Sequence, residues 1–204
     1  MADFFQGFLL SFIPLFVALD PVGVLPFILT LTQHMEPRER SRAVLYAMIT
    51  ALVMGLGFIA IGEGVFRLLG ITVAEFLVAG GVILLALSIN HLVRGKLVEI
   101  EPSVGYESIG VVPLGTPLIA GPAVLTTLLL LTDQFSDQGA VGIAVVVVGF
   151  LANLGIAWVV FAQANRVARL LRVGGMGAVS KIASLLLAAI AVKMISQGIQ
   201  NMLA

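Results

Sequence analysis

The chain has 204 residues, of which 60% are hydrophobic and 11% are charged, and its formal net charge is zero. A soluble domain is typically about 45–50% apolar and about 25% charged, so this chain cannot cover its surface with polar groups and its solvent must be largely lipid. The sequence contains no cysteine, which excludes disulfides, iron–sulfur clusters and thiolate metal sites. The neutral net charge argues against nucleic acid as a partner, and no cofactor is expected.

Six apolar runs are each long enough to cross a membrane, for which about 20 residues are needed. They cover about residues 4–31, 42–62, 72–93, 109–132, 140–162 and 179–200. The first run is expected to be retained as a span, because no basic residue precedes it as in a signal peptide. The sequence therefore predicts an all-α membrane protein of six transmembrane helices, which form a single domain over residues 1–204.

Nearly all of the charged residues lie in the connectors between these runs. Because basic loops stay on the cytoplasmic side of a membrane, the distribution of Lys and Arg predicts the orientation. The first, third and fifth connectors hold Arg38, Arg40, Arg42, Arg94, Lys96, Arg166, Arg169, Arg172 and Lys181. The second connector holds only Arg67, and the fourth holds none. We therefore expect a multi-pass protein of the cell inner (plasma) membrane with both termini on the outer, periplasmic side.

The two halves of the chain resemble each other. Aligning Pro21 with Pro122 brings the second apolar run opposite the fifth, and a slightly larger offset aligns Leu84 with Leu187. An odd number of spans in each half gives the halves opposite orientations, an inverted repeat that is typical of secondary transporters. The expected segments are a three-helix repeat over 1–93, a cytoplasmic linker over 94–108 and a second three-helix repeat over 109–204.

Spans 1 and 4 each contain a proline where a new helical segment can begin. In Asp20-Pro21-Val22-Gly23, a favoured N-cap residue precedes a proline at the first helical position. Gly121-Pro122 has the corresponding place in span 4, with glycine as the cap. In lipid, irregular backbone is tolerated only where protein or a wet cavity satisfies its polar groups. We therefore expect both spans to be broken, at Asp20-Pro21 and at Gly121-Pro122, and both breaks to face an interior cavity.

The two helix starts would give this cavity the groups to bind a small zwitterion. Each start carries a partial positive charge from its peptide dipoles and suits a carboxylate, whereas Asp20 would partner an ammonium group, a proton or a cation. The candidate substrate-binding residues are Asp20, Pro21, Gly23, Thr116, Gly121, Pro122, Thr126, Thr127, Asn153 and Lys193. No catalytic or metal-binding residue is predicted, and the chain is not expected to be an enzyme, because the spans hold no nucleophile–base pair or histidine cluster.

Three of these residues also have a purely structural interpretation. Asp20 could be a helix cap that backbone groups satisfy, although an ionisable residue at membrane depth costs at least about 2.5 kcal/mol and is usually retained for function. Lys193 could extend its ammonium group to the outer interface instead of facing the cavity. Asn153 could hydrogen-bond between helices rather than bind substrate. The sequence leaves these alternatives open.

Four segments resemble the MarC family of six-span inner-membrane proteins. They are Asp20-Pro-Val-Gly23, Glu36-Pro-Arg-Glu-Arg-Ser-Arg42, Ala79-Gly-Gly-Val-Ile-Leu-Leu-Ala-Leu87 and Pro113-Leu-Gly-Thr-Pro-Leu-Ile-Ala-Gly-Pro122. The family is similar in plan to the LysE-type amino-acid exporters. The resemblance implies a membrane transporter with small neutral amino acids as its substrate class, and it lends weight to Asp20, Pro21, Gly23, Gly121 and Pro122.

The predicted function is a secondary transporter, an exporter or exchanger, that moves a small neutral amino acid or similar zwitterion by alternating access. Its expected partners are this solute and the lipid bilayer, and a homo-oligomer is left open. Two alternatives remain: a metal or cation transporter of the wider three-plus-three group, and a membrane scaffold that transports nothing. A cation site would need several acidic residues at membrane depth, and Asp20 is the only one predicted there. A scaffold would not need two matching helix breaks.

Overall fold

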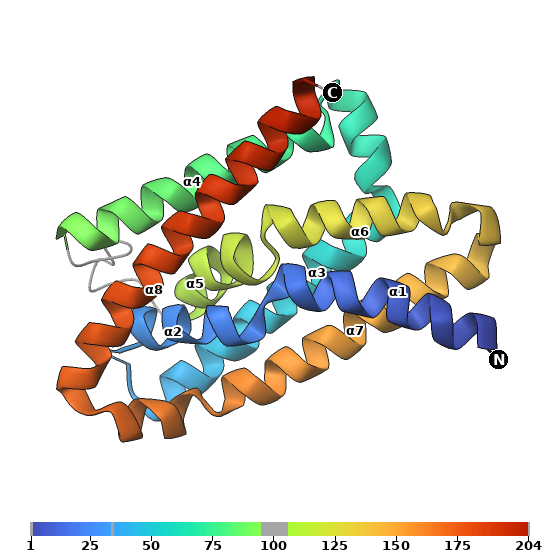
Figure 1. Cartoon of the computed structure of the whole chain (residues 1–204). Coiled ribbons are helices and arrows are strands. Elements are labelled where there is room, and N and C mark those ends of the chain that lie inside the picture. Colours follow the sequence, from blue (N-terminus) through green and yellow to red (C-terminus); the bar gives the residue numbers. More distant parts are fainter. Residues whose placement is uncertain (1, 34, 95–105, 204) are drawn as a thin grey trace.

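The apolar runs all fold as helices, which satisfy every backbone polar group within one segment and can therefore cross lipid. The computed structural model describes residues 2–33, 35–94 and 106–203, and the regular structure within them is helical throughout. The elements are α1 (Ala2–Leu19), α2 (Pro21–Leu31), α3 (Pro37–Leu69), α4 (Val73–Arg94), α5 (Tyr106–Ile109), the π-helical η1 (Gly110–Ile119), α6 (Pro122–Gln134), the 3-10 turn η2 (Ser136–Gln138), α7 (Gly139–Ala162) and α8 (Ala164–Leu203) (Figure 1).

Five stretches of the described residues are long and apolar enough to cross a membrane, or six if the bent pair of α5–η1 and α6 counts as one span. The predicted all-α membrane fold is thus confirmed. The predicted linker 94–108 lies for the most part outside the described residues. The bounds of two helices differ from the prediction. Helix α3 covers Pro37–Leu69 instead of about 42–62, and the sixth span is the C-terminal part of a 40-residue helix that begins at Ala164.

The early start of α3 has a local cause. Glu36 and Glu39 form a capping box, in which the Glu39 carboxylate accepts a hydrogen bond of 3.0 Å from the Glu36 backbone N–H. Pro37 follows the cap at the first helical position, where its missing N–H costs nothing. The arginines that we expected in a connector therefore lie on the first turns of a helix.

The first span is interrupted at Asp20, as predicted. Helix α1 ends at Leu19 and α2 begins at Pro21, while Asp20 has a left-handed backbone conformation with φ of 41° and ψ of 66°. Asp20 is the one non-glycine residue with positive φ in the part of the chain that the structure describes. The two helices continue in a similar direction and together form one candidate span, Phe5–Leu31 (Figure 1).

The fourth span is interrupted more severely. Pro113 and Pro117 lie inside η1, and the residues before them, Val112 and Thr116, have extended backbone instead of helical backbone. A regular helix resumes only at Pro122, and the axis turns by 56° between the two parts of the span. This confirms the break predicted at Gly121-Pro122, and it adds irregular backbone upstream of it.

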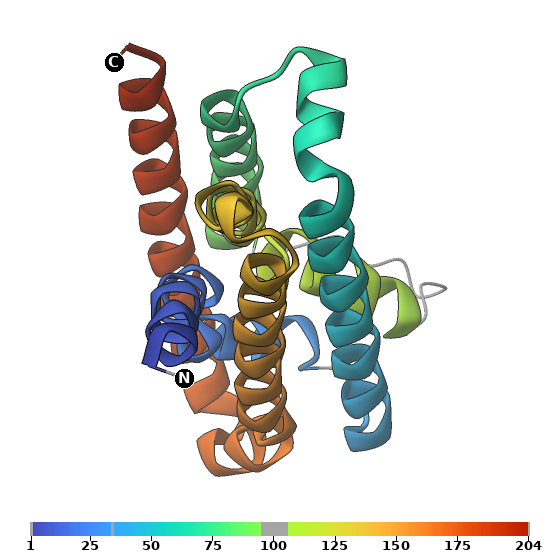
Figure 2. The ribbon, with the colours of Figure 1, turned by 90° about the vertical axis from the view of Figure 1, so that its right-hand side faces the viewer.

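The helices from the two halves of the chain pack against each other. Helix α4 lies along α8, α1 lies along α7, and η1 packs against α3 (Figures 1 and 2). The two short helices that follow the breaks are held between these pairs, since α2 packs on α8 and α6 packs on α3 and α4. The largest fully buried side chains in the core are Phe27, Phe150 and Phe161. The two helix breaks therefore come together in the middle of the fold.

The contact between α4 and α6 gives a first test of this packing. A methyl group at Gly80 would overlap the ring of Pro122, whereas one at Gly57 in α3 would meet no atom within 4 Å. Gly80→Ala is therefore expected to destabilise the folded protein by about 1–3 kcal/mol through overpacking. Gly57→Ala should leave stability unchanged or raise it, because alanine favours helix over glycine. Thermal unfolding of both purified variants in detergent measures the difference, and equal melting temperatures would contradict the packing at Gly80.

Candidate functional site

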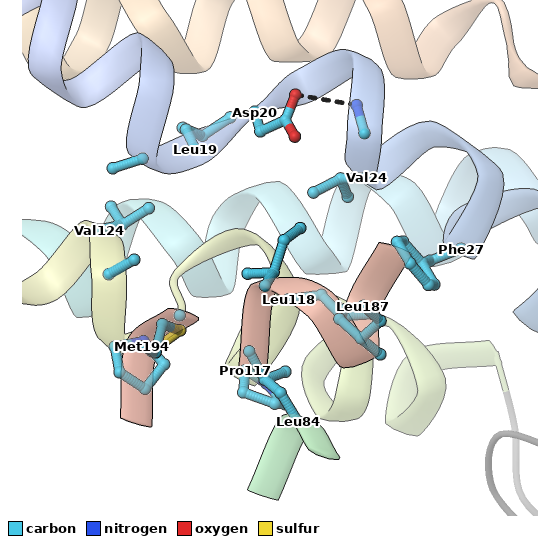
Figure 3. A pocket seen from close by; sticks show the side chains of 16 residues that line it. Leu19, Asp20, Val24, Phe27, Leu84, Pro117, Leu118, Val124, Leu187 and Met194 are labelled. Carbon is cyan, nitrogen blue, oxygen red and sulfur yellow. Dashed lines mark hydrogen bonds between the residues drawn. The ribbon is translucent and has the colours of Figure 1, made fainter. Parts of the chain in front are cut away.

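A cavity of about 60 Å³ lies between the two helix breaks (Figure 3). Since one water molecule needs about 10–15 Å³ by this measure, there is room for on the order of four waters or a small solute. Its lining residues come from α1 and α2, α4, η1, α6 and α8, and they are Ala18, Leu19, Asp20, Gly23, Val24, Phe27, Leu84, Pro117, Leu118, Gly121, Pro122, Ala123, Val124, Leu187, Ile190 and Met194. Four predicted site residues are thus brought together: Asp20, Gly23, Gly121 and Pro122.

Asp20 is the charged residue in this lining. Its Oδ1 atom accepts a hydrogen bond of 3.0 Å from the backbone N–H of Gly23 and so caps the start of α2 (Figure 3). The carboxylate lies directly over Gly23, where the β-carbon of any other residue would overlap Oδ2. The side chain of Asp20 is nevertheless exposed. The left-handed backbone at Asp20 and the missing side chain at Gly23 therefore fix a carboxylate that remains accessible.

The start of α6 is built differently. Gly121 is its N-cap and no side chain caps it, while Pro122 has no N–H to donate. The first turn of this helix, with Ala123 and Val124, lines the cavity. The positive end of a helix dipole therefore faces the cavity without a carboxylate of its own. The two breaks present opposite electrostatic characters, negative at Asp20 and positive at the start of α6.

The remaining side chains around the cavity are apolar. Leu84 from α4, Leu187 and Met194 from α8 and Phe27 from α2 contribute to its wall (Figure 3). Sequence reasoning did not assign these residues to the site. The available signal was the alignment of Leu84 with Leu187, because equivalent positions of two repeats that meet at a central cavity can both line it.

Six predicted residues lie outside the cavity lining: Pro21, Thr116, Thr126, Thr127, Asn153 and Lys193. Pro21 is buried at the first position of α2, and Thr116 is one of the two non-helical residues inside η1. Lys193 is exposed on α8. The hydroxyl of Thr127 donates to the carbonyl of Ala123 in its own helix, at 2.7 Å.

Asn153 connects α7 to α1. It is fully buried, and its side-chain amide donates to the carbonyl of Phe12 at 3.0 Å and to that of Gly149 at 2.8 Å. The hydroxyl of Ser11 makes a further bond between the same two helices, to the carbonyl of Val145 at 3.3 Å. Its amide nitrogen thus bonds between helices, while its Oδ1 atom has no hydrogen-bond partner among the described residues.

Thr126 is 4% exposed, and its hydroxyl has no hydrogen-bond partner among the described residues. It lies one helical turn beyond Pro122, which lines the central cavity, and one turn before Leu129, which lines the cleft between α3 and α6. The hydroxyl therefore lies on the face of α6 that runs from the cavity to that cleft. A buried hydroxyl without a partner is costly to the folded protein and marks a position where a ligand or water could bind.

Comparison with known proteins shows the family to which the chain belongs. A family model described as MarC family integral membrane protein matches residues 5–203. The chain belongs to the MarC family. Among its relatives, a UPF0056 membrane protein of Methanocaldococcus jannaschii is 34% identical, and the alignment covers 97% of this chain and 98% of that protein. The UPF0056 inner membrane protein YhgN of Escherichia coli K12 is 29% identical, with 91% and 92% covered. No solved structure matches the chain.

The two neighbouring threonines of α6 provide a matched pair of variants in this MarC-family chain. Thr126→Val removes a buried hydroxyl that has no partner, so the free energy of unfolding should stay the same or rise, by up to about 1–3 kcal/mol. Thr127→Val removes a hydroxyl that is bonded within its helix and should not raise stability. Melting temperatures of the two purified variants give the comparison. A clear loss of stability in Thr126→Val alone would mean that its hydroxyl is bonded in the folded protein.

Proposed function

We propose that this protein is a secondary transporter, an exporter or exchanger, for a small neutral amino acid or a similar zwitterion, and that it is not an enzyme. The observation that carries the proposal is the central cavity, where the Asp20 carboxylate and the uncapped start of α6 line the same space. An irregular backbone that faces a cavity at membrane depth is the usual form of a binding site in secondary transporters.

The chemistry of the cavity fits a zwitterion. An ammonium group would pair with Asp20, which carries the charge in the lining, and a carboxylate would lie at the positive end of the α6 dipole. The apolar wall around Leu84 and Leu187 would accept a short aliphatic side chain. The volume of about 60 Å³ favours the smallest members of this class.

Alternating access requires two similar units that can rock against each other, and we propose that residues 1–93 and 109–204 form an inverted repeat. The packing supports this arrangement, because the most extensive contacts between helices have counterparts. Helix α1 packs on α7 as η1 packs on α3, and α2 packs on α8 as α6 packs on α4. Helices α4 and α8 would be equivalent helices of the two repeats, so the contact between them is its own counterpart. Such an exchange of partners is expected of two interlocked repeats.

We further propose that both termini lie on the outer side of the inner membrane. The relative YhgN is named as an inner membrane protein. Arg40 of the first predicted basic connector hydrogen-bonds Asn165 at the fifth, so the two basic regions meet at one end of the fold. This supports the orientation in which both are cytoplasmic.

Asp20→Asn is the sharpest test of the central site. Asparagine also accepts the N-cap hydrogen bond and tolerates left-handed backbone, so the variant keeps the structure of the break and loses only the charge. The folded protein should therefore be retained, while uptake of a transported amino acid into proteoliposomes should fall at least tenfold or lose its coupling to an ion gradient. Unchanged and still coupled flux would remove Asp20 from the mechanism.

The solute itself can be found by a thermal-shift screen of the purified protein against the amino acids, at two pH values and with and without sodium. A ligand that binds the folded state raises the melting temperature. The same solute should give no shift with Asp20→Asn if the carboxylate binds its ammonium group. A shift that persists in this variant would place binding elsewhere.

A further inference from the structure

Arg40 has an unusual environment for a residue near the end of a membrane helix. It lies on the first turn of α3 and is only 7% exposed. Its guanidinium group donates three hydrogen bonds to described residues: to the hydroxyl of Thr32 at 2.9 Å, to the carbonyl of Thr32 at 2.8 Å and to the side-chain oxygen of Asn165 at 3.1 Å. One side chain therefore connects the end of α2, the start of α3 and the start of α8.

The partners of Arg40 are themselves held in place. Thr32 is fully buried, and its hydroxyl donates back to the carbonyl of Ile28 in α2. The amide of Asn165 donates to the carbonyl of Pro37 at 3.3 Å and to the hydroxyl of Ser41 at 3.1 Å. We call the group of Arg40, Thr32 and Asn165 the Arg40 latch, and the end of the fold where it lies the Arg40 end.

The latch has the properties of a contact that can open. The three bonds of Arg40 all end on neutral acceptors, and its charge is balanced by the carbonyl end of α2, where the helix dipole is negative. A buried ion pair would leave an uncompensated carboxylate in the fold whenever the arginine withdrew. Here the partners that would be left behind are a hydroxyl, a carbonyl and an amide, which water can satisfy.

Helix α2 connects the latch to the central cavity. Its first two turns, with Gly23, Val24 and Phe27, line the cavity, and its C-cap residue Thr32 is bound by Arg40. Helix α2 has 11 residues and is about 16 Å long, so its two ends are close to each other. A displacement of its Thr32 end would therefore also move the wall of the cavity.

The opposite end of the fold has no equivalent contact among the described residues. The alignment of Pro21 with Pro122 places Asp133 opposite Thr32 and Val141 opposite Arg40, and both counterparts are exposed. Two clefts of about 530 and 440 Å³ open beside the end of α6, and Leu129 and Asp133 line both of them. We call this the Asp133 end. The structure thus has the hydrogen bonds of the Arg40 latch at one end and two clefts at the other.

We propose that the Arg40 latch closes the central cavity toward the Arg40 end, and that its release is the step that exposes the cavity on that side. The inference rests on the proposed transport function for its purpose, and on the hydrogen bonds of Arg40 and the place of α2 for its geometry. The conformation described here is then the one in which the Arg40 end is shut.

The absence of native cysteine allows a direct test by labelling. Ala123→Cys places a single thiol in the cavity lining, and Asp137→Cys, in a separate protein, marks the side of the membrane on which the Asp133 end lies. A membrane-impermeant maleimide is added to either side of oriented vesicles. We expect the cavity thiol to react at least tenfold faster from the side that labels Asp137→Cys.

Arg40→Gln in the Ala123→Cys protein should raise the labelling rate from the Arg40 end at least tenfold. Arg38→Gln, which removes an exposed arginine of the same turn, should leave both rates unchanged. If Arg40→Gln does not fold, Thr32→Val is tested instead. This variant removes one hydrogen-bond acceptor of Arg40 without changing the shape of the side chain, and it should raise the labelling rate from the Arg40 end about threefold. Unchanged rates in the folded latch variants would overturn the latch. A protein that shows these rates but moves no amino acid would overturn the proposed transport function instead.

Discussion

The whole structure depends on one constraint, that backbone N–H and C=O groups in lipid must find partners inside the protein. Most of the chain meets it with unbroken helices, and two places do not. The start of α2 is satisfied by a carboxylate from its own chain, whereas the start of α6 has no side-chain cap and faces a cavity. The neighbouring helices enclose these two starts, since α2 packs on α8 and α6 packs on α3 and α4.

The breaks could be predicted because proline chemistry is local. Asp20-Pro21 and Gly121-Pro122 have cap and first-position residues in the right order, so no knowledge of packing was required. The all-helical fold, with its five or six candidate spans, followed in the same way from the length of the apolar runs. The backbone conformation of η1 was harder to predict. Pro113 and Pro117 indicate that a regular helix is disturbed, but they do not indicate which conformation replaces it.

The surroundings of single side chains were harder to predict, since they depend on how helices face each other. Asn153 and Lys193 were selected for their polarity within apolar runs. The structure places the first in a hydrogen bond between α7 and α1 and the second on the exposed face of α8, which the sequence alone did not show. Arg40 was counted only as a basic connector residue. Its place on a helix could have been recognised from Pro37, which is favoured at the first helical position, and from Glu39, an acid suited to a first turn. Its burial, however, depends on Thr32 and Asn165 from distant parts of the chain.

The contact between Asp20 and Gly23 has a consequence for how this segment can change in evolution. The space above residue 23 is occupied by the carboxylate of residue 20, so the two positions share one volume. A side chain at position 23 becomes admissible only when position 20 carries a smaller group, such as glycine, which also accepts the left-handed backbone. The two positions are therefore expected to covary. In a relative without the acid at position 20, glycine would no longer be required at position 23.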